Sequence, residues 1–197
     1  MFVCHEKKIV LVSVPKTGST TLHYTMIRAL GMEFFFDNPN AHLYHLFASD
    51  IDRIIGPAIR DYSVYAVVRN PYARLISLYN DFHGQRGAIK QNSFLKFVKT
   101  GLPGKWIRDV HFLPQSRFVI RTAGFGDCNI LRFEDGVQTI YDKIAKRHDL
   151  PPVEVGHARK GPAIGDFGRN YDADALEVAN EAYGSDFDAL EYDMIAP

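Results

Sequence analysis

Apolar residues form two nearly continuous runs in the first half of the chain. The run from Ile9 to Val14 is interrupted only by Ser13, and the run from Val64 to Val68 has no break. Short runs rich in β-branched residues are typical of strands that are buried on both faces, as in a parallel sheet. Two further candidate strands span Arg117 to Ile120 and Asn129 to Phe133.

Helical periodicity fills the segments between these runs. Ile51, Ile54, Ile55, Ala58 and Ile59 are spaced as on one face of a helix. Similar stripes predict helices near 22–30, 71–79, 137–144 and 173–183, with a short helix near 94–98. Strands that alternate with helices indicate an α/β fold, with a central parallel sheet flanked by helices, in a single domain over 1–197.

Composition narrows the class of protein. The chain has 197 residues, 46% hydrophobic and 23% charged, and its 23 basic residues balance 23 acidic ones. A nucleic-acid binder usually has a basic excess, so no nucleic-acid partner is expected. No apolar stretch approaches the length of a membrane span. Cys4 and Cys128 fit no metal or disulfide pattern, and we expect free thiols in a cytoplasmic protein. The oligomeric state is left open.

The loop after the first apolar run carries phosphate-binding chemistry. Val14 to Thr21 reads VPKTGSTT, a lysine and a glycine between a strand and a helix. Backbone amides in such a turn, the helix N-terminus and a lysine together suit an anion. The alternative is that Ser19 or Thr20 only caps the helix while Lys16 faces solvent. The lysine precedes the glycine, so the loop is not a Walker A motif.

A second strand-to-helix turn follows Val68. Arg69 ends the strand, and Arg74 and Ser77 lie three apart on the next helix, where they could share one anion. An arginine binds a terminal phosphate through two hydrogen bonds. The alternative pairs Arg69 with a carboxylate and leaves Arg74 and Ser77 solvated. Both turns lie at the carboxyl ends of strands, where α/β sheets bind ligands, and together they suit a nucleotide with 5′ and 3′ phosphates.

The motifs resemble those of the sulfotransferase superfamily. VPKTGSTTL at 14–22 is similar to its 5′-phosphosulfate loop, and VVRNPYARLISLY at 67–79 to its 3′-phosphate motif. Both resemble the branch that includes carbohydrate sulfotransferases and many small bacterial members. ILRFEDG at 130–136 and ARKGPAIGDFGRNY at 158–171 resemble later family segments. The resemblance implies a P-loop-like nucleotide-binding fold.

The resemblance also implies a donor and its ligands. The donor is 3′-phosphoadenosine-5′-phosphosulfate (PAPS), the product is the 3′,5′-bisphosphate (PAP), and no metal is required. Lys16 would stabilise charge on the leaving phosphate, and Arg69 and Ser77 would hold the 3′-phosphate. The remaining ligands implied are Pro15, Thr17, Gly18, Ser19, Thr20 and Thr21 at the 5′ end, and Arg159, Lys160 and Gly161 at the 3′ end.

Sulfuryl transfer to a hydroxyl needs a proton acceptor. The segment HLFASDID at 45–52 resembles a family stretch in which a histidine precedes a helix and the 3′-phosphate strand, so His45 is the expected base. His42 and Glu33 are the alternatives. We expect His83 and His111 to have structural roles. Glu134 and Asp135 are expected to supply helix N-terminal charge or to orient basic groups, not to act as an acid/base pair.

The expected function is PAPS-dependent transfer of a sulfuryl group to a small-molecule or carbohydrate hydroxyl. Two other functions stay open: a P-loop-type small-molecule kinase, which the missing GK[ST] disfavours, and a non-catalytic nucleotide-binding member of the fold. Segments 32–60 and 80–115 are expected to form the acceptor side. They are rich in aromatic residues, which suit sugars, phenols and lipid-like alcohols alike, although most are expected to pack in the core.

Overall fold

A computed structural model describes residues 1–31, 45–156 and 167–197. They form two compact units, each described by itself. The first contains residues 1–68 and 117–160, and the second contains residues 69–116 and 161–197. The single domain expected over 1–197 stays a prediction.

The first unit is built on a sheet in the order β1 (Phe2–Cys4), β2 (Ile9–Val12), β3 (Ser63–Val68) and β4 (Asn129–Arg132). β3 runs parallel to both β2 and β4, as the apolar runs predict. β1 is antiparallel to β2, so the sheet is mixed, and the parallel part that was predicted consists of β2, β3 and β4. The turn at residues 5–8 is too short for a crossover and only permits a hairpin.

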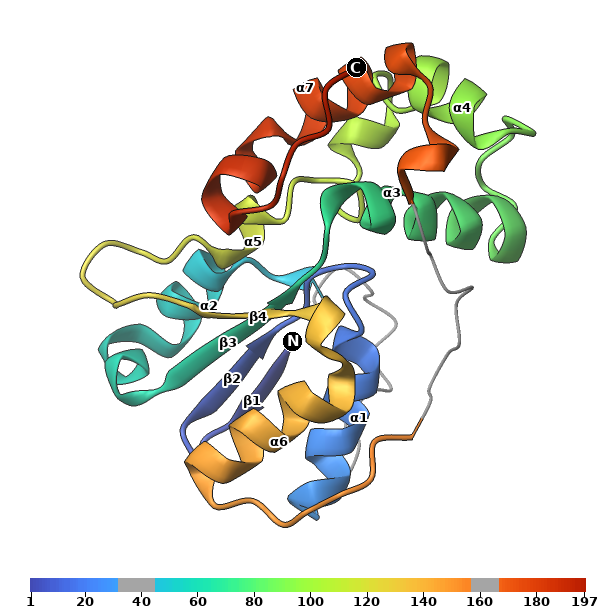
Figure 1. The fold of residues 1–197 in the computed structure, drawn as a ribbon. Helices are drawn as coiled ribbons and strands as arrows, with labels where there is room; N and C mark the ends of the chain where they lie inside the picture. Colours follow the sequence, from blue (N-terminus) through green and yellow to red (C-terminus); the bar gives the residue numbers. More distant parts are fainter. Residues whose placement is uncertain (32–44, 157–166) are drawn as a thin grey trace. The chain divides into compact units, whose positions relative to one another are not determined.

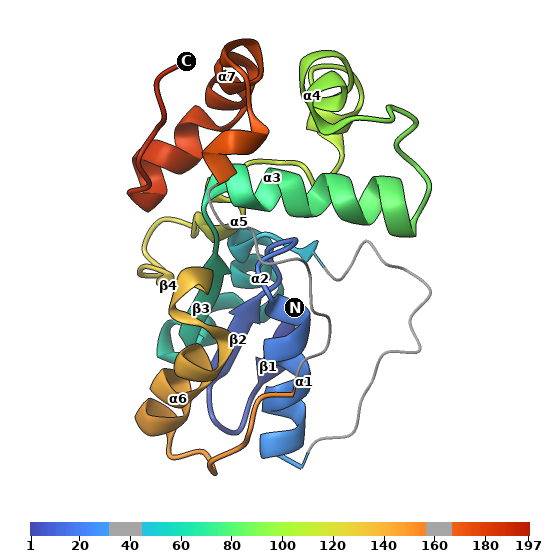
Figure 2. The same ribbon diagram turned by 45° about the vertical axis from the view of Figure 1, so that its right-hand side comes forward.

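Helices cover both faces of this sheet. α1 (Ser19–Ala29) and α6 (Val137–His148) pack on one face, while α2 (Ala48–Ile55) lies on the other (Figures 1 and 2). The core on the α1 and α6 side contains Leu11, Leu22, Met26, Tyr65, Val67, Ile140, Tyr141 and Ile144. A 3-10 helix, Gly56–Asp61, continues α2, and another, Phe133–Asp135, joins β4 to α6. The α/β architecture is therefore as predicted.

The strand expected at 117–120 does not form. Ser116–Val119 is instead the helical turn α5. Only Phe118 is buried in this run, whereas Arg117 and Ile120 are exposed. A three-residue apolar run cannot distinguish strand from helix by its periodicity, which accounts for the wrong prediction.

The second unit is helical in its described residues (Figure 1). α3 (Pro71–Tyr79) continues into a π-helical turn at Asn80–Gln85, and α4 (Phe94–Lys96) into another at Phe97–Gly101. Two 3-10 turns, Trp106–Arg108 and Phe167–Asn170, precede the long α7 (Ala173–Leu190). Aromatic side chains dominate the core, among them Tyr72, Phe82, Phe97, Trp106, Phe112 and Tyr183.

Candidate functional site

The loop between β2 and α1 is held in shape by its own hydroxyl groups. Thr17 Oγ1 donates to the Val14 carbonyl at 2.9 Å, and Ser19 Oγ donates to the same carbonyl at 3.1 Å. Both side chains are buried. These two hydroxyls therefore fix the turn in this structure, while Thr20 is exposed and Thr21 half-buried at the start of the helix.

Gly18 is required at its position for two independent reasons. Its φ of 77° lies in the left-handed region, where a side chain is strained. A Cβ built there would also lie 2.9 Å from Cε2 of the Phe133 ring. Phe133 comes directly after β4, so the segment at 130–136 shapes the loop by packing against Gly18. The sequence motif at 130–136 identified this segment but did not predict that Phe133 contacts Gly18.

The same loop combines a lysine side chain with the positive end of a helix. Lys16 also has positive φ, 65°, and its side chain is half-buried. Gly18 occupies the N-cap of α1, and the first turn of that helix has no acidic residue. The N-terminal amides and the helix dipole thus act together with the Lys16 charge. Residues 15–21 are consecutive in the chain and form a set whose chemistry fits a phosphate or phosphosulfate group, and their role as donor ligands stays a prediction.

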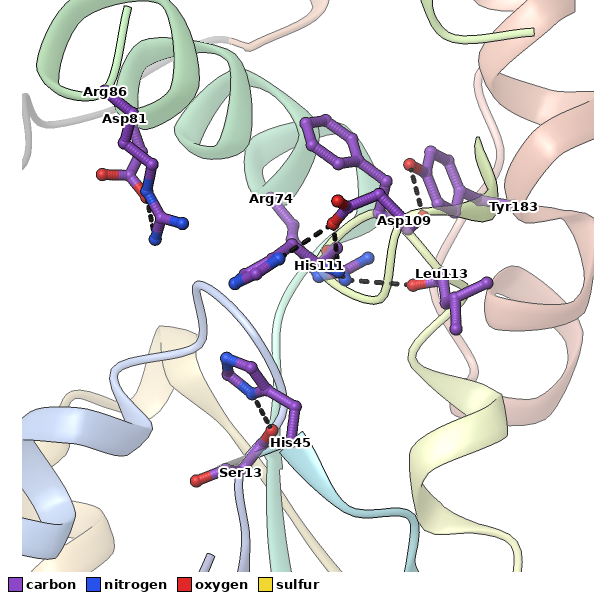
Figure 3. A network of polar contacts seen from close by, with 10 residues as sticks. Ser13, His45, Arg74, Asp81, Arg86, Asp109, His111, Leu113 and Tyr183 are labelled. Atoms are coloured by element: carbon purple, nitrogen blue, oxygen red, sulfur yellow. Dashed lines mark hydrogen bonds and ion pairs between the residues drawn. The ribbon is translucent and has the colours of Figure 1, made fainter. Parts of the chain in front are cut away.

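His45 lies against the residue that precedes this loop. Its Nδ1 is 2.7 Å from the Ser13 carbonyl oxygen, and Figure 3 shows the ring directed at that oxygen. A carbonyl only accepts, so Nδ1 carries the proton and neutral His45 has its lone pair on Nε2. The contact therefore fixes the tautomer that a proton acceptor at Nε2 requires.

His23 is a polar residue of this region that sequence reasoning missed. It is 2% exposed, and the Ser13 hydroxyl lies 3.4 Å from each ring nitrogen. Burial lowers the pKa of His23 well below its ordinary value, and the nearby His45 also contributes to the lowering. A signal was present in the sequence, because Ser19, Leu22, His23 and Met26 share one helix face and all are buried.

The turn that carries Arg69 is described within the second unit. The Asn70 side chain accepts from the amides of Tyr72 and Ala73 at 3.0 and 3.3 Å, and Pro71 starts α3 as predicted. Within α3 every residue except Ser77 is buried. Arg69 and Ser77 are each half-buried, so both have part of their surface in contact with solvent.

Arg74 does not have the expected position. It is 1% exposed, and its Nη2 donates to the carbonyls of His111 and Leu113 at 2.7 and 3.0 Å (Figure 3). Burial lowers the pKa of Arg74, while nearby Tyr183 and Asp186 raise it. The prediction that Arg74 shares an anion with Ser77 is therefore wrong: this guanidinium holds a chain segment in the core.

The other histidines and carboxylates named from the sequence make local contacts. His111 Nδ1 is 2.8 Å from Asp109 Oδ1, and burial is the main cause that lowers the pKa of His111. His83 Nδ1 donates to the Ile89 carbonyl at 3.0 Å. Asp135 pairs with Lys143 of α6 at 2.7 Å. These contacts agree with the structural roles expected for these residues.

Five of the predicted site residues lie outside the described part of the chain. They are the alternative bases Glu33 and His42, and the donor ligands Arg159, Lys160 and Gly161. Among the residues that are described, no group of three or more His, Cys, Asp or Glu is placed to hold a metal ion. Within 1–31, 45–156 and 167–197, no helix has both the length and the apolar character needed to cross a membrane.

The fold and the loop define an α/β protein with a candidate anion site at a strand-to-helix turn. Comparison with protein families adds the class. The model of the sulfotransferase family matches residues 1–193, so the chain belongs to that family. Membership makes it a transferase of sulfuryl groups. No curated protein and no solved structure gives a significant match to the chain.

Proposed function

We propose that the protein transfers a sulfuryl group from PAPS to the hydroxyl of a small-molecule or carbohydrate acceptor. Family membership supports sulfuryl transfer in general. The observation that carries the choice of donor is the loop at 15–21. It combines the Lys16 charge and two positive φ angles with the N-terminus of α1. This set of donors suits the anionic 5′ end of PAPS.

The residues present fit the donor chemically. PAPS supplies an activated sulfuryl group on a 5′-phosphate and carries a further phosphate at the 3′ position. The amides of residues 17–21 and Lys16 would hold the 5′ end. Arg69 and Ser77, which are both partly exposed, would hold the 3′-phosphate. Arg159, Lys160 and Gly161 are proposed to complete that end by family resemblance alone.

Two side chains would act on the reacting atoms. Nε2 of His45, whose lone pair the Ser13 contact preserves, would accept the proton of the acceptor hydroxyl. Lys16 would stabilise the negative charge that grows on the departing phosphate. Both belong to the first unit. No metal is part of the proposal.

The carbohydrate acceptor is proposed from the family resemblance. Within segment 80–115 the side chains of Phe82, Trp106 and Phe112 are buried in the core, so they offer no surface for stacking a sugar ring. Cytoplasmic location belongs to the same proposal, and the free thiols of Cys4 and Cys128 support it.

Calorimetric titration with PAP tests the proposal most directly. We expect metal-independent binding that Arg69→Ala weakens by about tenfold or more, as for a lost charged hydrogen-bond pair. Lys8→Ala, which removes an exposed lysine paired with Asp61 at 3.1 Å, is the matched control and should bind normally. ATP with Mg²⁺ is titrated alongside PAP. If PAP fails to bind, or ATP with Mg²⁺ binds more tightly, the donor assignment is wrong.

A further inference from the structure

One buried side chain, that of Gln115, forms hydrogen bonds with both the amide and the carbonyl of Arg69. The Arg69 amide donates to Oε1 of Gln115 at 2.9 Å, and Nε2 of Gln115 donates to the Arg69 carbonyl at 2.7 Å. Gln115 is 0% exposed. A carboxamide offers a donor and an acceptor, as a peptide group does, so Gln115 pairs with Arg69 as a neighbouring strand would. This contact spans 46 residues of sequence.

Gln115 is in turn held by a buried carboxylate. Asp186 Oδ2 accepts from the Gln115 amide at 2.8 Å, and Oδ1 accepts from the Ser116 amide at 2.7 Å. Asp186 Oδ2 also lies 3.4 Å from Nε2 of Gln115, and its side chain is fully buried. The Asp186 carboxylate on α7 therefore fixes both the backbone and the side chain of Gln115.

Two more buried groups hold the segment that leads to Gln115. Arg74 donates to the carbonyls of His111 and Leu113, and the Tyr183 hydroxyl donates to the Phe112 carbonyl at 3.0 Å. Figure 3 shows Arg74 and Tyr183 directed at this segment from α3 and α7. A residue held this firmly can set the position of the chain that it grips.

We propose that Gln115, supported by Asp186, is a positioning residue that aims Arg69 at the 3′-phosphate of the donor. The inference rests on the proposed function, because it takes Arg69 as the 3′-phosphate ligand. Arg69 follows the last residue of β3 directly and lies before the first turn of α3. We call the two hydrogen bonds between the Gln115 side chain and the Arg69 backbone the clamp. Without the clamp, the Arg69 amide and carbonyl would lose these partners, and the backbone from which the guanidinium extends would no longer be held in place. The clamp thus favours nucleotides that carry a 3′-phosphate over those that lack it.

The measured quantity is the ratio of the dissociation constants for 5′-AMP and PAP, which isolates recognition of the 3′-phosphate. We expect Gln115→Met, which keeps length but removes both hydrogen bonds, to lower this ratio about fivefold and to change 5′-AMP affinity less than about twofold. In an Arg69→Ala background the same change should lower the ratio no further, because Gln115 acts through Arg69.

Leu176→Ala is the control for a merely structural role. It removes core volume from α7 in the same unit, so it should lower the melting temperature and leave the ratio unchanged. If Gln115→Met does not fold, Gln115→Asn decides, since its shorter carboxamide cannot span both backbone groups. A variant ratio equal to that of the wild type overturns the clamp alone. A wild-type protein without preference for PAP over 5′-AMP overturns the proposed donor instead, so the two failures are distinguishable.

Discussion

Replacing Arg74 with methionine tests whether this arginine is structural, as its burial indicates, or binds an anion. Methionine keeps most of the aliphatic length and removes the guanidinium. The carbonyls of His111 and Leu113 then lose their donors inside the core. Each buried acceptor left unpaired costs about 1–3 kcal/mol. Asp186 also loses a favourable charge nearby, since these two groups interact electrostatically.

One opposing effect reduces this cost. Burial lowers the pKa of Arg74, which means that the folded protein already bears a penalty for desolvating the cation. Removing the charge recovers part of that penalty. Breaking one side of a buried charged network typically costs about 3–5 kcal/mol overall. We expect Arg74→Met to lower the free energy of unfolding by about this amount, and Arg74→Lys, which keeps the charge, by about half as much.

Urea unfolding at neutral pH measures the change, and Arg69→Ala is the matched comparison. Arg69 is half-buried, so its truncation should cost about 1 kcal/mol or less while it abolishes the 3′-phosphate preference. An Arg74→Met protein with unchanged unfolding free energy and lost PAP binding would contradict the reasoning. That result would return Arg74 to the anion site.

Three further substitutions test the first unit. Gly18→Ala should cost about 2 kcal/mol in urea unfolding, because it strains a positive φ and meets Phe133; full stability would mean that the loop relaxes freely. His45→Asn should lower the rate of sulfuryl transfer about 10²–10⁴-fold and leave PAP affinity within about twofold; equal losses in both would exclude a role as base. His23→Gln should reduce the pH dependence of stability between pH 5.5 and 7.5. Burial keeps His23 neutral when folded, whereas the unfolded chain takes up its proton near pH 6.5, so wild-type stability should fall by up to about 1.4 kcal/mol per unit below that pH. Equal pH slopes in the two proteins would refute the assignment.

The elements that sequence patterns found are those whose signals are local. β2 and β3 lie in continuous apolar runs, and α3 starts at Pro71, where the predicted helix begins. β1 escaped prediction because three residues carry no periodicity. Its antiparallel direction depends on a tight turn, with Lys8 at a φ of 52°, that no glycine or proline marks.

The candidate site also has parts with a local sequence signal and parts without one. The loop proposed to bind the 5′ end of the donor could be recognised because its lysine, glycine and hydroxyl residues are consecutive in the chain. The clamp on Arg69 could not, since Gln115 lies 46 residues from Arg69 and Asp186 another 71 residues beyond Gln115. Such pairings are set by tertiary packing, which leaves no spacing in the sequence to detect. His45 was proposed as the base from family resemblance, and its tautomer came only from the Ser13 contact.

Arg69 and Arg74, the two arginines of the second turn, differ in burial, and this difference separates a ligand-binding role from a structural one. Both lie in one motif, both carry a charge, and either could bind a phosphate on sequence grounds. Arg74 has its Nη2 hydrogen bonds directed at backbone carbonyls and is 1% exposed, so a ligand could reach it only by breaking those bonds. Arg69 has its backbone fixed by Gln115 while its side chain stays partly exposed. Recognition of a terminal phosphate requires a charged side chain that is accessible and that extends from a fixed backbone. Arg69 is therefore the arginine that the proposal assigns to the donor.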